Sequence, residues 1–301
     1  MPIITIYYYL YLPITKNQMT IRQIIPTYSA KLKSSSPVLD IEILLAKTLN
    51  KNKEYLYTYP DKKLTAKKSA TFKKLFNRRN NGEPVAYILG YQEFFNLNFK
   101  VDPRVLIPRP ETEILVEEVI KYYKSKIQDL KSKICIADIG AGSGAIIIAL
   151  AKNIKKAEFW GAEISKKALQ IAKQNAKLHQ VKIKFLKGNL LDPLQSVICD
   201  PQSDSIITAN LPYLTSQELK NPNLKYEPQI ALKGGADGLK LFQTFFNQIQ
   251  KFKLQPQSIF LEIGHKQAAA IKKLARHALP NYKFKVVKDL CGFDRLVIIS
   301  K

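Results

Sequence analysis

The sequence predicts an α/β protein in which a small helical domain and a β-hairpin precede a doubly wound, parallel sheet. Three observations lead to this prediction. Apolar residues recur at helical spacing from about residue 20 to 81, and short strand-like runs occupy 82–110. From Lys133 onward, apolar strands alternate with helical stretches, which indicates parallel strands joined by crossover helices.

Length and composition allow two domains and exclude several protein classes. The chain has 301 residues, of which 46% are hydrophobic and 24% are charged, so wholesale disorder and low-complexity fibres are excluded. Its net charge of +24 would suit binding to nucleic-acid phosphates. However, Lys greatly outnumbers Arg, and Lys, Asn, Ile and Tyr are all abundant, as in a compositionally biased proteome. We therefore favour a solvated basic surface over a nucleic-acid function.

Residues 1–18 are interpreted as an N-terminal extension, and two readings of it remain open: a segment of the native protein, or a segment that the native protein lacks. The apolar, Tyr-rich run 3–14 is shorter than the roughly 20 residues that a membrane helix needs. No basic residue precedes the run and no small-residue cleavage site follows it, so it makes a poor signal peptide. The alternative to a native extension is a translation start at Met19, where MTIRQII opens a helical pattern.

Segment 19–81 is predicted to form three to five short helices, one of which starts near Ser36 and Pro37. We interpret it as a substrate-docking domain, and a solvated packing domain is the alternative. Segment 82–110 is predicted to be a linker with a β-hairpin around Asn96. The main domain then covers 111–301, and its first helix has a Glu-rich first turn that suits a helix N-terminus.

A glycine loop with the sequence DIGAGSG, Asp138 to Gly144, ends one strand and opens a helix. Glycines allow a tight turn and close approach of the backbone to a ligand. The G-x-G-x-G pattern differs from the dinucleotide G-x-G-x-x-G, and the Asp138 carboxylate would repel a phosphate. The same carboxylate would attract an ammonium or sulfonium group, which favours S-adenosylmethionine over NAD.

Glu163 stands at the end of the next strand, 25 residues after Asp138. A carboxylate at this place can accept hydrogen bonds from both hydroxyls of a ribose. The alternative for a single Glu at a strand end is an ordinary solvated side chain. Its position relative to the glycine loop favours a contact with a nucleoside cofactor.

The tetrapeptide Asn210-Leu211-Pro212-Tyr213 follows another apolar strand and should face the same crevice. The Asn210 side-chain oxygen and the Leu211 carbonyl can accept both N–H bonds of an amide or exocyclic amine, while Tyr213 offers an aromatic wall. Pro212 keeps Leu211 extended. Taken alone, the tetrapeptide could equally be a turn after a strand.

Transfer of a sulfonium methyl group needs no nucleophile from the protein, because alignment and preorganised acceptors suffice. Accordingly, the sequence contains no Ser-His-Asp or Cys-His constellation. Its three Cys and three His are scattered, so we expect no metal site and no disulfide framework. The odd, unpaired cysteines fit a reducing compartment.

Four segments together resemble the bacterial peptide chain release factor N(5)-glutamine methyltransferases. They are the glycine loop, the NLPY tetrapeptide, VLIPRPETE (105–113) and EPQIALKGGADGL (227–239), and the resemblance extends over nearly the whole chain from Met19. It implies a Rossmann-like, class I methyltransferase domain that uses S-adenosylmethionine. It also implies methylation of the side-chain amide of the glutamine in the Gly-Gly-Gln loop of release factors, in the cytoplasm and without membrane association.

Carried over residue by residue, the resemblance implies a set of site residues. The cofactor contacts would be Asp138, Gly140, Ala141, Gly142, Ser143, Gly144, Glu163, Asn189, Leu190 and Asn210. The catalytic and substrate-binding residues would be Asn210, Leu211, Pro212 and Tyr213, and substrate contacts would also come from Arg109 and Glu111, with Glu113 on the peptide side or steadying the linker.

The sequence departs from the family pattern at three positions. Leu211 replaces the usual Pro, which should be tolerated because the expected contact there is a backbone carbonyl. Glu163 replaces the more usual Asp and moves the carboxylate out by one methylene. Asn189 stands where many relatives have Asp, which puts a charged contact to the adenine amino group in doubt.

Two other functions remain as alternatives. N(6)-adenine methyltransferases of RNA or DNA resemble the chain in the glycine loop and the Asn-x-Pro-Tyr motif, although such enzymes extrude the base and usually carry a target-reading module. A non-catalytic RNA- or ribosome-binding protein is the second alternative, but the intact Gly140, Gly142, Gly144 and Asn210 argue against it.

Overall fold

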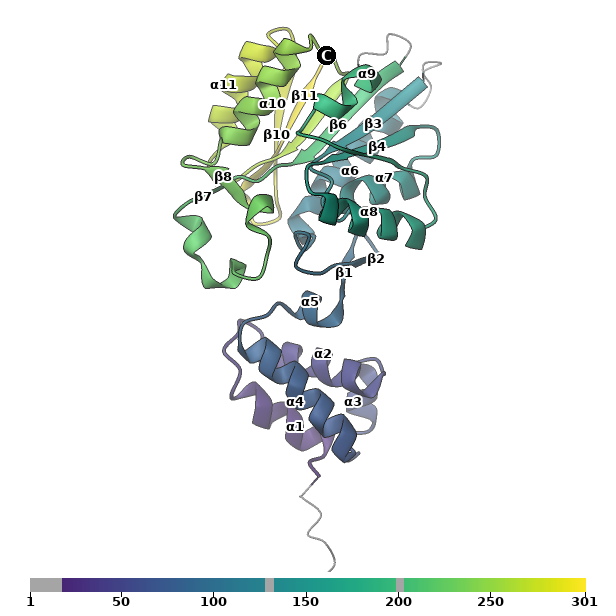
Figure 1. Ribbon diagram of the computed structural model, residues 1–301, viewed down its shortest axis with the longest axis vertical. Coiled ribbons are helices and arrows are strands. Elements are labelled where there is room, and N and C mark those ends of the chain that lie inside the picture. Colours follow the sequence, from purple (N-terminus) through teal and green to yellow (C-terminus); the bar gives the residue numbers. More distant parts are fainter. Residues whose placement is uncertain (1–17, 128–132, 199–202) are drawn as a thin grey trace, which may run out of the picture. The chain divides into compact units, whose positions relative to one another are not determined.

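The computed structural model describes residues 18–127, 133–198 and 203–301. The chain divides into two compact units, one ending at Leu89 and one running from Gly90 to Lys301 (Figure 1). The boundaries that we predicted at residues 81 and 110 therefore fall inside these units. Residues 1–17 of the proposed extension 1–18 lie outside the described residues, and so does Cys199.

The first unit is helical over its described residues. Its elements are α1 (Ile21–Ser29), α2 (Pro37–Leu49), α3 (Glu54–Thr58), α4 (Ala66–Asn80) and α5 (Val85–Leu89). Helix α1 begins with a capping box, in which the Thr20 hydroxyl accepts from the Gln23 N–H and the Gln23 side chain accepts from the Thr20 N–H. Buried residues of these helices, including Leu44, Leu45 and Phe72, form a single core.

The second unit begins with the predicted hairpin. Strands β1 (Tyr91–Phe94) and β2 (Leu97–Lys100) pair antiparallel with Phe94 opposite Leu97. The two turn residues, Phe95 and Asn96, have φ values of 51° and 57°, which is the geometry of a type I′ turn. The hairpin lies within the second compact unit and is attached to it, because Glu113 Oε1 accepts a hydrogen bond from the Phe95 N–H at 2.9 Å.

A seven-stranded sheet forms the centre of the second unit, in the order β10-β11-β9-β6-β3-β4-β5. The strands are β3 (Lys133–Ile139), β4 (Glu158–Glu163), β5 (Lys184–Lys187), β6 (Ser203–Asn210), β9 (Ser258–Glu262), β10 (Lys283–Lys288) and β11 (Asp294–Ser300). Strands β3, β4, β5, β6 and β9 pair in parallel.

The expectation of a fully parallel sheet is wrong at one strand. Strand β11 runs antiparallel to both of its neighbours, β9 and β10. Only residues 289–293 connect β10 to β11, and a parallel pair would need a crossover of about a dozen residues or more. A hairpin is the connection that this short segment permits, so the sheet is mixed and retains the Rossmann-like arrangement.

Helices cover both faces of the sheet. They are α6 (Glu113–Tyr122), α7 (Ala145–Asn153), α8 (Lys166–Leu178), α9 (Gln195–Ile198), α10 (Lys240–Lys251) and α11 (Ala268–Ala278). Figure 1 shows α10 and α11 on one face and α6 and α7 on the other. The two faces of the sheet carry separate hydrophobic cores. Alternate residues of β3 pack into different cores: Ala137 and Ile139 lie in one, and Ile134 and Ile136 lie in the other.

Short elements lie above the carboxyl ends of the strands. They include η1 (Pro110–Thr112), η3 (Asp192–Leu194), the parallel pair β7 (Leu214–Thr215) and β8 (Lys233–Gly235), η4 (Glu218–Lys220), η5 (Pro222–Leu224) and η6 (Gln229–Ala231), while the π-helix η2 (Tyr123–Ile127) continues α6.

Among the described helices, none is long and apolar enough to cross a membrane. In the same residues no group of His, Cys, Asp and Glu is arranged to hold a metal ion.

Candidate active site

Four polar segments meet at the carboxyl edge of the sheet. The glycine loop follows β3, Glu163 ends β4, Asn210 ends β6, and Glu262 ends β9. The chain order reverses between β3 and β6, and open α/β sheets bind ligands in the crevice at such a switch point. The topology therefore brings together three segments that the sequence suggested, and it adds Glu262.

Glu163 organises the glycine loop. Its Oε2 accepts from the Gly142 N–H at 2.9 Å, and its Oε1 accepts from the Ser165 N–H at 2.8 Å. The N–H groups of Gly140 and Ala141 donate to the Ala162 carbonyl. A carboxylate offers about four lone-pair directions, so both Glu163 oxygens keep capacity to accept from a ligand.

Residues from this loop and from neighbouring strand ends line one cavity, which we call the glycine-loop cavity. Six of the predicted cofactor contacts line it: Gly140, Gly142, Glu163, Asn189, Leu190 and Asn210. Four others are buried and do not appear among its described lining residues: Asp138, Ala141, Ser143 and Gly144. Gly144 instead has a φ of +81°, which L side chains rarely adopt, and a Cβ there would also lie 3.4 Å from Ala172 Cβ.

The residues of this cavity fit a nucleoside cofactor that carries positive charge. Gly142 has a φ of +54°, and a Cβ built on it meets only the Gly140 oxygen, at 3.8 Å, so a side chain would project into the cavity. Apolar side chains such as Ile164 and Leu190 supply walls for a planar base. The acidic Glu163 faces the same space, as ribose recognition requires.

Asp138 adds a buried acidic group behind the loop. Its Oδ1 accepts from the Thr208 hydroxyl at 2.8 Å, whereas its Oδ2 has no hydrogen-bond partner among the described residues. The pKa of the Asp138 carboxyl is raised to about 7, mainly by burial; the Thr208 hydrogen bond opposes this shift and the nearby charge of Glu163 contributes to it. A cationic ligand would relieve this accumulation of negative charge.

Two buried side chains that the sequence analysis did not single out support the cavity walls. Gln248 on α10 accepts from the Leu191 N–H at 2.9 Å and donates to the Asn189 carbonyl, which holds the loop after β5. Asn175 on α8 donates to the Ser143 carbonyl at 2.9 Å and also pairs with the backbone of Lys100. The glycine loop and the β-hairpin are thus tied to one helix.

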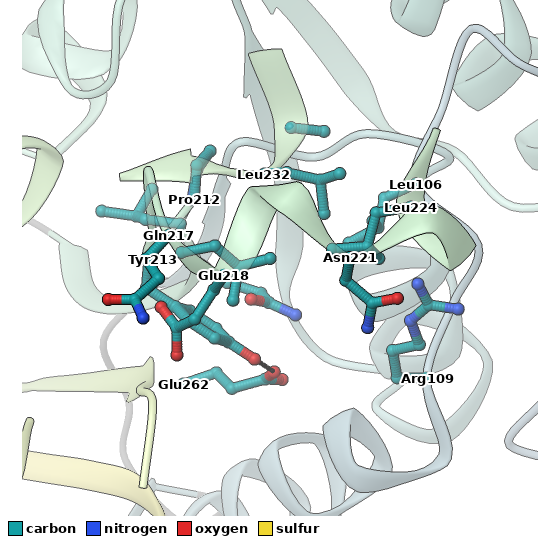
Figure 2. Close-up of a pocket in the computed structure, with 14 residues that line it drawn as sticks. Leu106, Arg109, Pro212, Tyr213, Gln217, Glu218, Asn221, Leu224, Leu232 and Glu262 are labelled. Atoms are coloured by element: carbon teal, nitrogen blue, oxygen red, sulfur yellow. Dashed lines mark hydrogen bonds between the residues drawn. The ribbon is translucent and has the colours of Figure 1, made fainter. Parts of the chain in front are cut away.

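A second cavity, of about 550 Å³, adjoins the first at the NLPY tetrapeptide. We call it the Tyr213 cavity. Its lining includes all four residues of the tetrapeptide, together with Arg109 and Glu262, and Figure 2 shows the Tyr213 hydroxyl directed at Glu262 with Arg109 across the cavity. Glu111, predicted to contact substrate, is exposed and is not among the described lining residues.

Asn210, Leu211 and Pro212 line both cavities. The Asn210 Nδ2 donates to the Thr112 hydroxyl at 3.2 Å, so the Asn210 oxygen is left to accept from a ligand. The Leu211 side chain is buried in the core. Leu106 and Ala231 also line both cavities, so the two cavities adjoin at these five residues.

Glycines of the segment 227–239 allow this segment to pack against the tetrapeptide. A Cβ on Gly234 would lie 2.6 Å from Tyr213 Cα, and one on Gly238 would overlap the Tyr213 carbonyl oxygen. Gln267 closes the arrangement, because its Nε2 donates to the carbonyls of Tyr213 and Gly238, each at 3.3 Å. The glycines are therefore needed for close backbone approach beside the site.

Burial of Tyr213 and Glu262 shifts the pKa values of their side chains. Burial raises the pKa of the Tyr213 hydroxyl well above its usual value, and the Glu262 charge raises it further. Burial also raises the pKa of the Glu262 carboxyl to about 7. Tyr213 is therefore a neutral hydroxyl at neutral pH, and it donates to Glu262 Oε1 over 3.4 Å.

Comparison with known proteins decides the family. Residues 23–90 match the model of the PrmC N-terminal domain, and residues 130–289 match that of a methyltransferase domain. A release factor glutamine methyltransferase from Thermodesulfovibrio yellowstonii is 36% identical over 285 residues, which cover 93% of this chain and 96% of the relative. The chain belongs to the release factor glutamine methyltransferase family.

Other comparisons agree with this family and with the fold. The release factor glutamine methyltransferase of Coxiella burnetii is 36% identical over 270 residues, 89% of this chain and 93% of that protein. Among solved structures, the catalytic domain of hMettl16 in complex with the MAT2A 3′UTR hairpin 1 matches with a TM-score of 0.54. That match has 16% identity, covers 74% of this chain and 80% of the other, and shows the shared methyltransferase fold alone.

Arg109 and Glu227 form an ion pair between two segments that resemble the family, 105–113 and 227–239. Glu227 is 4% exposed, forms an ion pair with Arg109 and accepts from the Ile107 N–H at 3.1 Å. The first segment resembling the release factor glutamine methyltransferases, 105–113, is thereby tied to the last, 227–239. Glu227 opens the segment 227–239, and its occurrence in that motif is the sequence signal that could have indicated its role.

We expect Glu227→Ala to destabilise the second unit by about 1 to 3 kcal/mol, because it leaves the buried Ile107 N–H without an acceptor and the guanidinium without its anion. Urea denaturation measures the change. The control is Glu158→Ala, which breaks exposed ion pairs with Lys133 and Lys184 in the same unit and should cost less than about 1 kcal/mol. Equal losses for the two variants would contradict the role of Glu227.

Proposed function

We propose that this chain transfers the methyl group of S-adenosylmethionine to the side-chain amide nitrogen of the glutamine in the Gly-Gly-Gln motif of peptide chain release factors. One observation carries the proposal: Asn210, Leu211 and Pro212 line two adjoining cavities, one suited to a nucleoside and one open to a side chain. A donor in one cavity and an acceptor in the other can thus both contact these three residues.

In this proposal the glycine-loop cavity holds the cofactor. Glu163 accepts from the ribose hydroxyls, Leu190 and Ile164 contact the base, and Asp138 compensates positive charge. The bound S-adenosylmethionine supplies a methyl group that its sulfonium already activates. The chain therefore contributes binding and alignment, and no nucleophilic side chain is required.

The substrate glutamine enters the proposed site through the Tyr213 cavity. Its amide N–H groups donate to Asn210 Oδ1 and to the Leu211 carbonyl, which turns the nitrogen lone pair toward the methyl donor. The same acceptors stabilise the positive charge that develops on the nitrogen as the N–C bond forms and the S–C bond breaks. After transfer the nitrogen would lose one proton to solvent water, and Tyr213 provides the wall against which the planar amide rests.

We further propose that the helical unit docks the release factor, in the cytoplasm where the factor works. The unit has its own core and a lysine-rich surface on α4, and none of its described residues, 18–89, lines either cavity. A role in docking rather than chemistry is supported by this separation.

Methylation of adenine in RNA or DNA is the alternative, and the names of the relatives do not favour it. The chemical problem is similar, because an exocyclic amine also presents a planar nitrogen with two N–H groups. Likeness to an RNA-bound domain at 16% identity carries no argument about substrate.

A transfer assay with labelled S-adenosylmethionine tests the proposal. Purified release factor, the same factor with its Gly-Gly-Gln glutamine changed to alanine, total RNA and DNA are offered as acceptors. Label on the intact factor alone is the expected result. Label on nucleic acid, or equal label on the altered factor, would overturn the proposed acceptor.

A further inference from the structure

We propose that Ile230, in the segment 227–239, forms a wall of the glycine-loop cavity against which the base of the cofactor packs. The inference rests on the proposed function, because it takes this cavity as the cofactor site. It gives a binding role to a segment of which the proposed transfer uses no side chain. The group that Ile230 would contact is a planar, uncharged nucleobase.

Two strongly exposed apolar side chains, Ile164 and Ile230, line the glycine-loop cavity. Ile164 is 49% exposed and Ile230 is 59% exposed, whereas Leu190 in the same lining is 9% exposed. Exposed apolar surface that borders a cavity is typical of a ligand-binding site. Leu190 is already covered by the protein, while Ile164 and Ile230 both keep apolar surface that a ligand can cover.

The backbone that carries Ile230 is held on both sides. Before it, Glu227 is 4% exposed and accepts from the Ile107 N–H at 3.1 Å. After it, Leu232 is 5% exposed and its carbonyl accepts from the Leu214 N–H at 3.0 Å. The exposure of Ile230 therefore belongs to an anchored turn, η6, which presents this side chain at a defined place.

The segment around Ile230 borders both cavities, and its residues divide between them. Pro228 and Ile230 line the glycine-loop cavity, Leu232 lines the Tyr213 cavity, and Ala231 lines both. Ile230 thus lies on the cofactor side of this segment. Its apolar side chain is available to the cofactor and not to the substrate glutamine.

The chemistry of the cavity favours the base, among the parts of the cofactor, as the group that contacts Ile230. Glu163 suits the ribose hydroxyls, and the buried carboxyl of Asp138 suits positive charge. The amino acid part of the cofactor carries an ammonium and a carboxylate, and packing either against Ile230 would cost free energy of solvation. A base that covers Ile164 and Ile230 removes apolar surface from water and gains free energy.

The experiment measures the affinity of the purified chain for S-adenosylmethionine by calorimetric titration, for wild type, Ile230→Ser and Ile230→Leu. We expect Ile230→Ser to weaken binding by about 5- to 20-fold, because it removes the apolar surface that the base covers. Ile230→Leu should stay within about 3-fold of wild type. Urea denaturation should give wild-type stability for both variants, since the side chain is 59% exposed.

A truncated ligand separates the base from the amino acid part of the cofactor. 5′-Methylthioadenosine keeps the base and the ribose and lacks the ammonium and the carboxylate. Ile230→Ser should weaken its binding by the same factor as that of S-adenosylmethionine. A loss confined to S-adenosylmethionine would place Ile230 against the amino acid part and overturn the proposed contact with the base.

The matched control is Leu178→Ser at the end of α8. Leu178 is also 59% exposed, and it is not among the described lining residues of either cavity. Its affinity for both ligands should equal that of wild type. Unchanged affinity in Ile230→Ser, or an equal loss in Leu178→Ser, would overturn the role of Ile230.

The titrations contain no release factor, so they are independent of the proposed acceptor. If the wild type bound neither ligand, the proposed cofactor site would be rejected, and the role of Ile230 with it. If the wild type bound the cofactor but failed to label release factor, only the proposed acceptor would be rejected. Weaker binding of both ligands by Ile230→Ser would still support the wall.

Discussion

Changing Asn210 to Ala should lower kcat for methyl transfer by about 10² to 10³-fold while the affinity for S-adenosylmethionine stays within a few-fold. The side chain supplies one of two preorganised acceptors for the substrate amide, and loss of such a group typically has this effect. The cofactor retains Glu163 and the glycine loop, which do not depend on the Asn210 side chain. Steady-state kinetics and a calorimetric titration measure the two quantities.

The control for this variant is Asn153→Ala at the end of α7, where the amide only donates to the Ala149 carbonyl. Its kcat should match that of wild type. If Asn210→Ala lost cofactor affinity and kcat to the same degree, Asn210 would be a cofactor residue and its role toward the substrate would be rejected.

Changing Gly142 to Val should weaken the binding of S-adenosylmethionine by at least about 100-fold. The added side chain would occupy the glycine-loop cavity, and a β-branched residue strongly disfavours the φ of +54° at this position. Titration of the purified variant with the cofactor measures the loss. Transfer at low cofactor concentration should fall in parallel.

The control must separate occlusion of the cavity from backbone strain. Gly292 has a φ of +82° and lies in the β10–β11 hairpin, where an added Cβ would meet no atom of the described residues within 4 Å. Gly292→Val therefore introduces similar strain away from the cavity and should leave cofactor affinity unchanged. An unaltered affinity in Gly142→Val would argue against the glycine loop as the cofactor site.

Much of the fold could be predicted from local pattern. The run KICIADI became β3 over its whole length, and the turn at Asn96 joined two short strands as expected. The reversed strand β11 was missed because alternation of strands and helices was extended to the end of the chain. The five-residue connection before it already excluded a parallel pair.

The residues of the candidate site also differ in whether a local sequence pattern could predict them. Gly142, Glu163 and Asn210 carry local signals, namely a glycine turn, an acidic strand end and a polar residue after an apolar strand. Glu262 carries the same strand-end signal as Glu163, but nothing in the linear pattern distinguishes it until β9 is placed beside β6. Thr112 has no local signal at all, because its hydrogen bond is to Asn210, which lies 98 residues away in the chain.

The sequence by itself determined which segments bear the chemistry: hydrophobic periodicity and the placement of Gly, Pro and polar residues depend on near neighbours along the chain. Only the tertiary structure decided that Asn210 lines two cavities, that Glu227 ties the loop of Arg109 in place, and that the Asn210 amide donates to Thr112. The physical reason is that cavities, buried ion pairs and hydrogen-bond direction depend on strand order and on contacts between residues far apart in the chain.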